Sequence, residues 1–188
     1  RELRLAHSST HTSGIVDYED LVPDSQTTQL NDNDVLALVH RTDTRNFAPG
    51  SAYHYSNSAY VLLGLIVQRV SGIPFPKFHH DRIFAPLHMD STVAYVKGAS
   101  TVPNRAYGYT GDSSGRFTRT DQSSTSATLG DGGIYTSLAD MAQWSDALDP
   151  ATLVDSATMR KACSPTLLPT GKEGGCGYGR FVARCKCR

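Results

Sequence analysis

The longest regular pattern of apolar and polar positions follows the letters YHYSN at positions 53–57. Apolar side chains then recur with the spacing i, i+3, i+4, i+7 and i+11, which predicts a helix with one buried face. The positions concerned are Ala59, Leu62, Leu63, Ile66 and Val70. Asn57 or Ser58 would cap this helix, and Gly72 would end it because glycine readily adopts a left-handed conformation. Gly64 costs a helix about 1 kcal/mol relative to alanine, so its presence predicts close packing against a neighbour.

Weaker patterns predict several shorter helices. The letters NDN precede residues 34–40 and are good caps for a helix there. Another helix is expected over residues 74–83, before the turn P-L-H-M. Ser137 and Asp140 form an S-x-x-D capping signal for a further helix. The face expected for it comprises Leu138, Met141, Ala142, Ser145 and Leu148. A last capped segment is expected to begin near Ser156.

The region from Tyr95 to Gly130 has no such pattern. It is rich in Ser, Thr, Gly and Asp with isolated aromatic residues, a composition typical of loops or short strands. No internal repeat, low-complexity segment or linker divides the chain. We therefore expect one domain spanning residues 1–188.

Charge and hydropathy exclude some kinds of partner. Eighteen Lys and Arg residues balance eighteen Asp and Glu residues. The chain thus has no electrostatic footprint for nucleic acid or an anionic membrane surface, and a small neutral or mixed-charge ligand fits better. The longest apolar run, from Tyr60 to Val67, is far shorter than the roughly 20 residues that cross a bilayer, so no membrane span is expected.

The four cysteines all lie near the end of the sequence. They are Cys163, Cys176, Cys185 and Cys187. This distribution is too lopsided for a set of disulfides that holds the whole fold. Zinc binding is an alternative, but the terminal C-x-C lacks the usual ligand spacing and no histidine lies among the cysteines. Free or locally paired thiols are favoured, and no metal or other cofactor is expected.

Four stretches carry a resemblance to a known family. They are THTSGI at 10–15, FAPGSAYHYSNSAYVLLGLIVQRVSG at 47–72, IFAPLHMDST at 83–92 and GDGGIYTSLADMAQW at 130–144. In this order they resemble the serine beta-lactamase and penicillin-binding-protein superfamily, in particular the class C beta-lactamases and their esterase and D-aminopeptidase relatives. One departure is His88, which stands where that family usually has glycine.

The resemblance implies an α+β fold in which a mixed sheet lies beside a mostly helical region. This chain would supply mainly the helical region and one wall of the cleft. In that family the serine of an S-x-x-K motif attacks an amide or ester carbonyl and forms an acyl-enzyme. By resemblance, Tyr55 is the proton-transfer tyrosine, Asn57 binds substrate or orients the site, and Ser56 is a spacer. The alternative for Tyr55 is a partly buried aromatic residue with a hydrogen-bonded hydroxyl and no chemical role. The resemblance also favours the periplasm or export, although the chain shows no signal peptide.

Two motifs of that family are missing from the sequence. No serine is followed by lysine three positions later, and neither K-T-G nor H-x-G occurs. We expect these motifs to lie beyond Arg1 and beyond Arg188, so that the chain is a fragment truncated at both ends. A tyrosine with an ordinary pKa near 10 stays almost entirely neutral at pH 7 without nearby cations. We therefore expect this chain to be nearly inactive.

Other serines and histidines give weaker alternatives. Ser8, Ser9, Ser13 and Ser51 are interpreted as cap or turn residues. The seven histidines leave a Ser-His-Asp arrangement open, although no G-x-S-x-G elbow supports it, and the adjacent His79 and His80 lack the spacing of a metal site. A function of another class also stays open, namely a non-catalytic ligand-binding or interaction protein of the same fold. The sequence leaves the oligomeric state undetermined.

Overall fold

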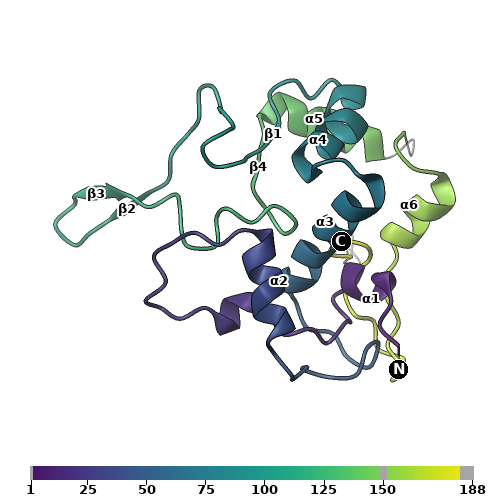
Figure 1. Cartoon of the computed structure of the whole chain (residues 1–188). Helices are drawn as coiled ribbons and strands as arrows, with labels where there is room; N and C mark the ends of the chain where they lie inside the picture. The colour runs from purple at the N-terminus through teal and green to yellow at the C-terminus, as the bar shows by residue number, and fades with distance from the viewer. Residues whose placement is uncertain (1, 149–151, 183–188) are drawn as a thin grey trace, which may run out of the picture.

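The computed structural model describes residues 2–148 and 152–182 (Figure 1). The helices are α1 (Leu5–Ser9), α2 (Asp32–His40), α3 (Asn57–Ser71), α4 (Phe75–His79), α5 (Leu138–Leu148) and α6 (Ser156–Ala162). A 3-10 turn spans Tyr18–Leu21, and α4 continues into a π turn (His80–Phe84) and a 3-10 turn (Ala85–Leu87). The strands are β1 (Val93–Ala94), β2 (Tyr109–Gly111), β3 (Phe117–Arg119) and β4 (Ile134–Tyr135).

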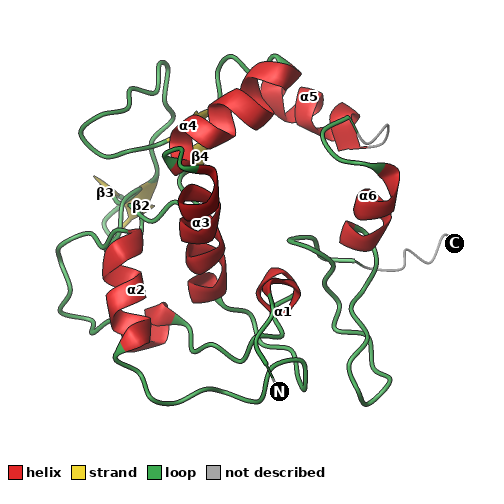
Figure 2. Cartoon of the chain, turned by 45° about the vertical axis from the view of Figure 1, so that its right-hand side comes forward, coloured by secondary structure: helices red, strands yellow, loops and turns green. Residues whose placement is uncertain are grey.

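Helix α3 contacts α1, α2, α4 and the 3-10 turn Tyr18–Leu21, with α2 beside it and α1 near its first turn (Figure 2). It ends as predicted, because Gly72 adopts a left-handed conformation with φ of 69°. The start differs by one residue from the prediction. Ser56, and not Asn57 or Ser58, caps the helix, and its Oγ accepts a hydrogen bond from the Ala59 N–H at 3.2 Å.

Close packing at Gly64 is confirmed. A Cβ built on Gly64 would lie 2.9 Å from the Cα of Gly130, and a Cβ built on Gly130 would lie 2.5 Å from the Tyr60 carbonyl oxygen. The Gly130 turn is held from the other side by Asp32, whose Oδ1 accepts hydrogen bonds from two backbone N–H groups, those of Leu129 at 3.0 Å and Gly130 at 3.2 Å. Two glycines therefore let a turn from late in the chain lie directly on α3.

The face of α3 that is buried matches the predicted stripe only in part: Ala59 is buried and Leu62 and Leu63 are half-buried, whereas the positions nearer the end of the helix are exposed. The fully buried residues of the helix are Ser58, Ala59, Val61 and Gly64. At the predicted positions, Ile66 is 38% exposed and Val70 is 82% exposed. The helix turns its small residues inward because the Gly130 turn and the buried Tyr18 approach that side closely.

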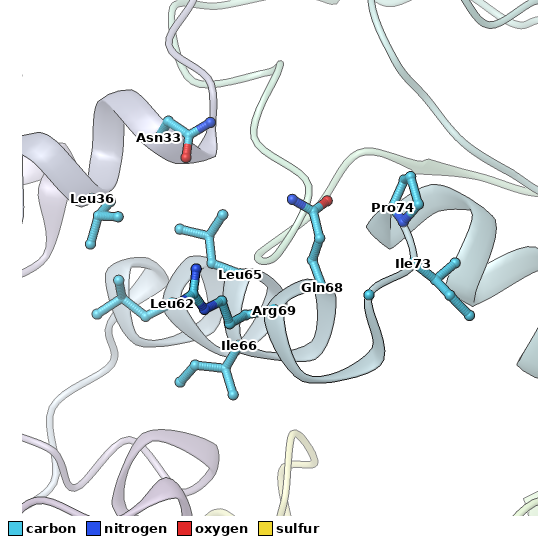
Figure 3. A pocket seen from close by; sticks show the side chains of 10 residues that line it. Asn33, Leu36, Leu62, Leu65, Ile66, Gln68, Arg69, Ile73 and Pro74 are labelled. Atoms are coloured by element: carbon cyan, nitrogen blue, oxygen red, sulfur yellow. The ribbon is translucent and has the colours of Figure 1, made fainter.

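Leucine and isoleucine side chains of α3 that are not fully buried line a groove against α2. This groove has a volume of about 760 Å³ (Figure 3). Its apolar wall is formed by Leu36 from α2 and by Leu62, Leu65 and Ile66 from α3. The groove lies along the second half of α3, away from the end at which the helix begins.

Helix α5 confirms one part of its prediction and contradicts another. The Ser137 Oγ accepts a hydrogen bond from the Asp140 N–H at 3.1 Å, as the capping signal predicted. The expected inward face is wrong, since Leu138 is 90% exposed and the helix buries Asp140 and Ala147. The Asp140 carboxylate explains this rotation. Its Oδ2 accepts hydrogen bonds from the Ser91 N–H at 2.9 Å and the Thr92 hydroxyl at 2.6 Å.

The remaining predicted segments are short in the structure. The helix expected over residues 74–83 is a single turn of α4 followed by π and 3-10 turns, which His88 ends with φ of 54°. The segment expected near Ser156 is α6, capped by Asp155. The region 95–130 is mostly loop, as predicted, with one antiparallel hairpin of β2 and β3.

Two apolar clusters form the core. One contains Tyr18, Val35 and Val61 and joins the 3-10 turn to α2 and α3. The other is formed by residues that follow α4 together with part of α5, namely Phe84, Leu87, Met89, Ala94 and Ala147. A second antiparallel pair, β1 with β4, lies next to this cluster. No single helix within the described ranges is long and apolar enough to cross a membrane, although α3 and the segment Phe75–Leu87, bent by 80°, pass that test as a pair.

Residues near the two ends of the described chain meet beside α3. The Ser9 carbonyl accepts hydrogen bonds from the Tyr60 hydroxyl at 2.7 Å and from the Gly179 N–H at 3.1 Å. Of the cysteines, Cys163 is exposed and Cys176 is buried, and both are free thiols. Cys185 and Cys187 lie outside the described residues. No group of three or more His, Cys, Asp or Glu side chains in the described ranges could hold a metal ion.

Candidate functional site

Tyr55 lies in the turn that leads into α3, with 47% of its surface exposed. No described residue forms a hydrogen bond with its hydroxyl group. The ring is therefore only partly buried, and its hydroxyl group is accessible.

Asn57, the first residue of α3, is fixed by its backbone. Its N–H donates to Oδ2 of the buried Asp17 at 2.6 Å. A carboxylate at this position also interacts favourably with the positive end of the helix dipole. The side-chain amide of Asn57 has no hydrogen-bond partner among the described residues. Tyr55 and Asn57 thus bring two unpaired polar side chains to the same end of α3.

The segment that contains the letters THTSGI holds the turn before α3 in place. The His54 N–H donates to the His11 carbonyl at 3.0 Å, and the Gly50 N–H donates to the Thr12 carbonyl at 2.8 Å. Further along, the Tyr18 N–H donates to the Ser58 hydroxyl at 2.7 Å. Two of the stretches that carry the family resemblance therefore lie side by side.

His11 is buried beneath the site, although sequence reasoning assigned it no role. Its ring centroid lies 4.5 Å from that of Tyr55 and 4.8 Å from that of Tyr60, with interplanar angles of 30° and 32°. Its Nδ1 accepts a hydrogen bond from the Ser56 N–H at 3.2 Å. Burial lowers the pKa of His11 below its usual value of 6.5, against the opposing charge of Asp17.

Negative charge and burial both act on the tyrosines of the site. Burial raises the pKa of Tyr55 above 10.0, and the charges of Asp131, Asp17 and Glu19 raise it further. Burial also raises the pKa of Tyr60, to about 12. The Tyr55 phenol is therefore neutral at pH 7, and only an added cation close to its oxygen would favour the phenolate.

Asp131 is a further acidic residue close to the site, and it is half-buried. Its Oδ2 accepts a hydrogen bond from the Tyr18 hydroxyl at 3.0 Å, while its Oδ1 is buried with no partner among the described residues. Burial raises the pKa of the Asp131 carboxyl. Tyr18, Thr128 and Asp131 together connect the 3-10 turn to the glycine-rich turn next to α3.

The interpretation of Ser56 as a mere spacer is wrong, because its buried hydroxyl caps α3. Three of the other serines bond to nearby backbone, in agreement with their interpretation as cap or turn residues. Ser9 and Ser51 donate to the carbonyls of Leu5 and Ala48, and Ser13 accepts from the N–H of Ile15.

The same fold occurs in solved structures of penicillin-binding proteins and amidohydrolases. The penicillin-binding protein from Bacillus halodurans superposes with a TM-score of 0.76 and 28% sequence identity, over 94% of this chain and 55% of that protein. A D-amino acid amidase from Ochrobactrum anthropi SV3, complexed with L-phenylalanine amide, gives a TM-score of 0.71 at 22% identity, over 93% of this chain and 52% of that protein. The chain is therefore an α+β part of the beta-lactamase and penicillin-binding-protein fold.

Sequence comparison assigns the chain to a family. The family model named Beta-lactamase matches residues 1–187, so the chain belongs to the Beta-lactamase family. Penicillin-binding protein 4* of Bacillus subtilis (strain 168) is 28% identical over 93% of this chain and 42% of its own length. The D-aminopeptidase of Brucella ovis is 30% identical over 76% of this chain and 27% of its own length. The chain thus spans less than half the length of these two relatives.

Proposed function

We propose that the whole protein is a serine hydrolase that acts on an amide or ester bond through an acyl-enzyme. In this proposal Tyr55 transfers protons during acylation and deacylation, and Asn57 binds the substrate or orients the site. A D-aminopeptidase and a penicillin-binding protein among its relatives support a substrate with an amide bond. Residues 1–188 contain no S-x-x-K motif, so we propose that this chain alone has almost no activity.

The observation that carries the proposal is the exposure of Tyr55 together with its unpaired hydroxyl. Tyr18, which is buried, and Tyr60, which is half-buried, use their hydroxyl groups in hydrogen bonds to other residues, whereas the hydroxyl of Tyr55, at the start of α3, is free of any such bond within the described ranges. The free side-chain amide of Asn57 adds a donor and an acceptor at the same end of the helix. Both groups are therefore available to a ligand.

The electrostatics support the need for partners outside residues 1–188. A general base must lose its proton at the working pH, whereas the surroundings of Tyr55 raise its pKa. A cationic side chain beside the phenol oxygen would reverse this shift, and a neighbouring serine hydroxyl would supply the nucleophile. We propose that other segments of the whole protein provide both groups.

The test compares this chain with the whole protein on three substrates: a chromogenic cephalosporin, D-phenylalanine amide and a short-chain nitrophenyl ester. We expect turnover only by the whole protein. We expect Tyr55→Phe to lower its kcat by about 10²–10⁴-fold, the usual contribution of a positioned acid or base. The matched control is Tyr109→Phe, because Tyr109 is 58% exposed and lies in the distant β2.

Two results would overturn the proposal. One is a whole protein that turns over none of the three substrates. The other is full activity of the Tyr55→Phe variant. Tight binding of a substrate without turnover would instead favour the non-catalytic ligand-binding function.

A further inference from the structure

We propose that His11 is a positioning residue for Tyr55. It would act through the backbone on both sides of the tyrosine and through the face of the ring. This inference rests on the proposed role of Tyr55. It concerns a residue that has no assigned role in the chemistry, and it predicts measurements that can be made on this chain without any turnover.

The first argument is that one residue binds both backbone neighbours of Tyr55. The His54 N–H donates to the His11 carbonyl at 3.0 Å, and the Ser56 N–H donates to the His11 Nδ1 at 3.2 Å. The Ser56 N–H belongs to the peptide group that directly follows Tyr55, and the His54 N–H lies one peptide group before the bond that joins His54 to Tyr55. The backbone on both sides of Tyr55 is therefore tethered to His11, within one residue of the tyrosine on each side.

The second argument concerns the ring of Tyr55 itself. One face of it lies against the His11 imidazole, with centroids 4.5 Å apart and an interplanar angle of 30°. The same imidazole also contacts the ring of Tyr60, with centroids 4.8 Å apart and an interplanar angle of 32°. Tyr60 is anchored in turn by its hydroxyl, which donates to the Ser9 carbonyl at 2.7 Å. Tyr55 is thus the exposed member of a stack whose two inner rings are fixed.

The third argument is that the hydrogen bond from the Ser56 N–H requires one particular tautomer of the neutral His11 imidazole. Nδ1 can accept the Ser56 N–H only when it carries no proton, so the neutral ring must hold its proton on Nε2. The charged group that faces His11 is Asp17, and the tyrosines that contact its ring are Tyr53, Tyr55 and Tyr60. Because His11 is only 4% exposed, burial outweighs the attraction of Asp17 for a protonated ring.

The backbone of His11 identifies a conservative variant. Its φ is 55°, a left-handed conformation that asparagine and histidine tolerate much better than branched or bulky apolar residues. The Oδ1 of asparagine can also occupy the place of Nδ1 and accept the Ser56 N–H. His11→Asn therefore preserves the backbone and the acceptor but removes the ring, whereas His11→Leu removes both ring and acceptor.

The first experiment needs no variant. In ¹⁵N-labelled chain, we expect a scalar coupling through the hydrogen bond between the Ser56 amide nitrogen and His11 Nδ1. We also expect the imidazole nitrogen shifts of the neutral form with the proton on Nε2. Absence of the coupling, or a His11 ring protonated on Nδ1 at pH 7, would overturn the proposal.

The second experiment separates the two contacts. When 3-fluorotyrosine replaces tyrosine, the ¹⁹F NMR signal of Tyr55 can be assigned as the one that the Tyr55→Phe variant lacks. We expect the chemical shift of this signal to change in both His11 variants, because both lose the imidazole ring that stacks on Tyr55. Exchange of the Ser56 amide should be about fivefold faster or more in His11→Leu and close to wild type in His11→Asn, since only the first removes the acceptor. The matched control is Tyr60→Phe, which keeps an aromatic ring at position 60 but loses the hydroxyl that donates to the Ser9 carbonyl.

A merely structural histidine would give a different result. Replacement would then lower stability while the exchange of the Ser56 amide followed global unfolding equally in both variants, and this result would overturn the proposal. In the whole protein we expect His11→Leu to lower kcat at least tenfold with little change in KM, and His11→Asn to restore part of that loss. If the coupling and exchange results hold but Tyr55→Phe is fully active, the proposed function fails and the positioning of Tyr55 still stands.

Discussion

Gly64 and Gly130 touch where helix α3 passes the glycine-rich turn, with only 2.9 Å between the Cα of Gly130 and a Cβ built on Gly64. Alanine normally stabilises a helix by about 1 kcal/mol relative to glycine. Here we expect Gly64→Ala to destabilise the chain by about 1–3 kcal/mol, because the methyl group has no room. Urea unfolding followed by circular dichroism measures this difference.

The control for that prediction is Gly132→Ala in the same turn. No atom lies within 4 Å of a Cβ built there, and its backbone φ is not in the left-handed range. We expect this change to be neutral. A Gly64→Ala variant as stable as wild type would show that α3 and the turn are not in direct contact.

Asp140 is expected to be the most sensitive polar residue of α5. Its buried carboxylate accepts hydrogen bonds from the Ser91 N–H and the buried Thr92 hydroxyl, so Asp140→Ala removes the acceptor of both bonds. We expect a loss of about 2–3 kcal/mol in the free energy of unfolding. Asp146→Ala changes an exposed residue of the same helix and should be close to neutral. Equal effects of the two changes would contradict the rotation of α5 described above.

The stability of the chain should fall in mildly acidic solution because of two histidines. Burial lowers the pKa of both His11 and His79 from the value of 6.5. Below about pH 6.5 the unfolded chain binds more protons at these rings than the folded chain does. Their contribution to stability is therefore complete above pH 6.5 and is lost as pH falls toward the lower folded values.

The contribution of the two histidines is measured by comparing how the free energy of unfolding depends on pH in the wild type and in variants. The carboxyls of Glu19 and Asp131, whose pKa values are raised by burial, act in the opposite direction and remain in every variant. We expect His11→Asn with His79→Phe to flatten the dependence between pH 5 and pH 7, and replacement of the exposed His40 by glutamine to leave it unchanged. An unchanged slope in the double variant would contradict this account.

The hairpin of β2 and β3 should depend on Arg105. This side chain pairs with Asp121 and lies over the rings of Tyr135 at 4.5 Å and Tyr107 at 5.0 Å. We expect Arg105→Leu to speed amide hydrogen exchange in the hairpin while α3 keeps its protection. Arg116→Leu, at the exposed hairpin tip, is the control. Loss of protection throughout the chain would show that the hairpin and α3 unfold together.

The sequence predicted the existence of α3 better than its orientation. The stripe of leucine, isoleucine and valine reports which side chains are apolar, whereas the buried face is decided by which side another segment can approach. That side is the one with Gly64 and Ser58, because a glycine admits the Gly130 turn and a hydroxyl accepts the Tyr18 N–H. Neither contact has a signal in hydrophobic periodicity.

The same limit applies to the candidate site. The sequence proposes Tyr55 and Asn57 as site residues because they stand in one short motif. His11 and Asp17 were missed because they approach that motif only after the segment at 10–18 folds against residues 53–58. The letters THTSGI were a usable signal. A histidine in a stretch that resembles a family motif is a candidate partner of the Y-S-N letters at 55–57.

The carbonyl of Ser9 has a consequence for synthesis on the ribosome. It accepts one hydrogen bond from Tyr60, beside the ring stack of Tyr55, and another from Gly179. Residue 179 leaves the exit tunnel long after α3 does, and pairings between residues so far apart form slowly. In a nascent chain whose synthesis stops shortly before residue 179, α3 should therefore be present without the bond from Gly179 to Ser9 beside its first turns. Until residue 179 emerges, this part of α3 stays accessible to chaperones.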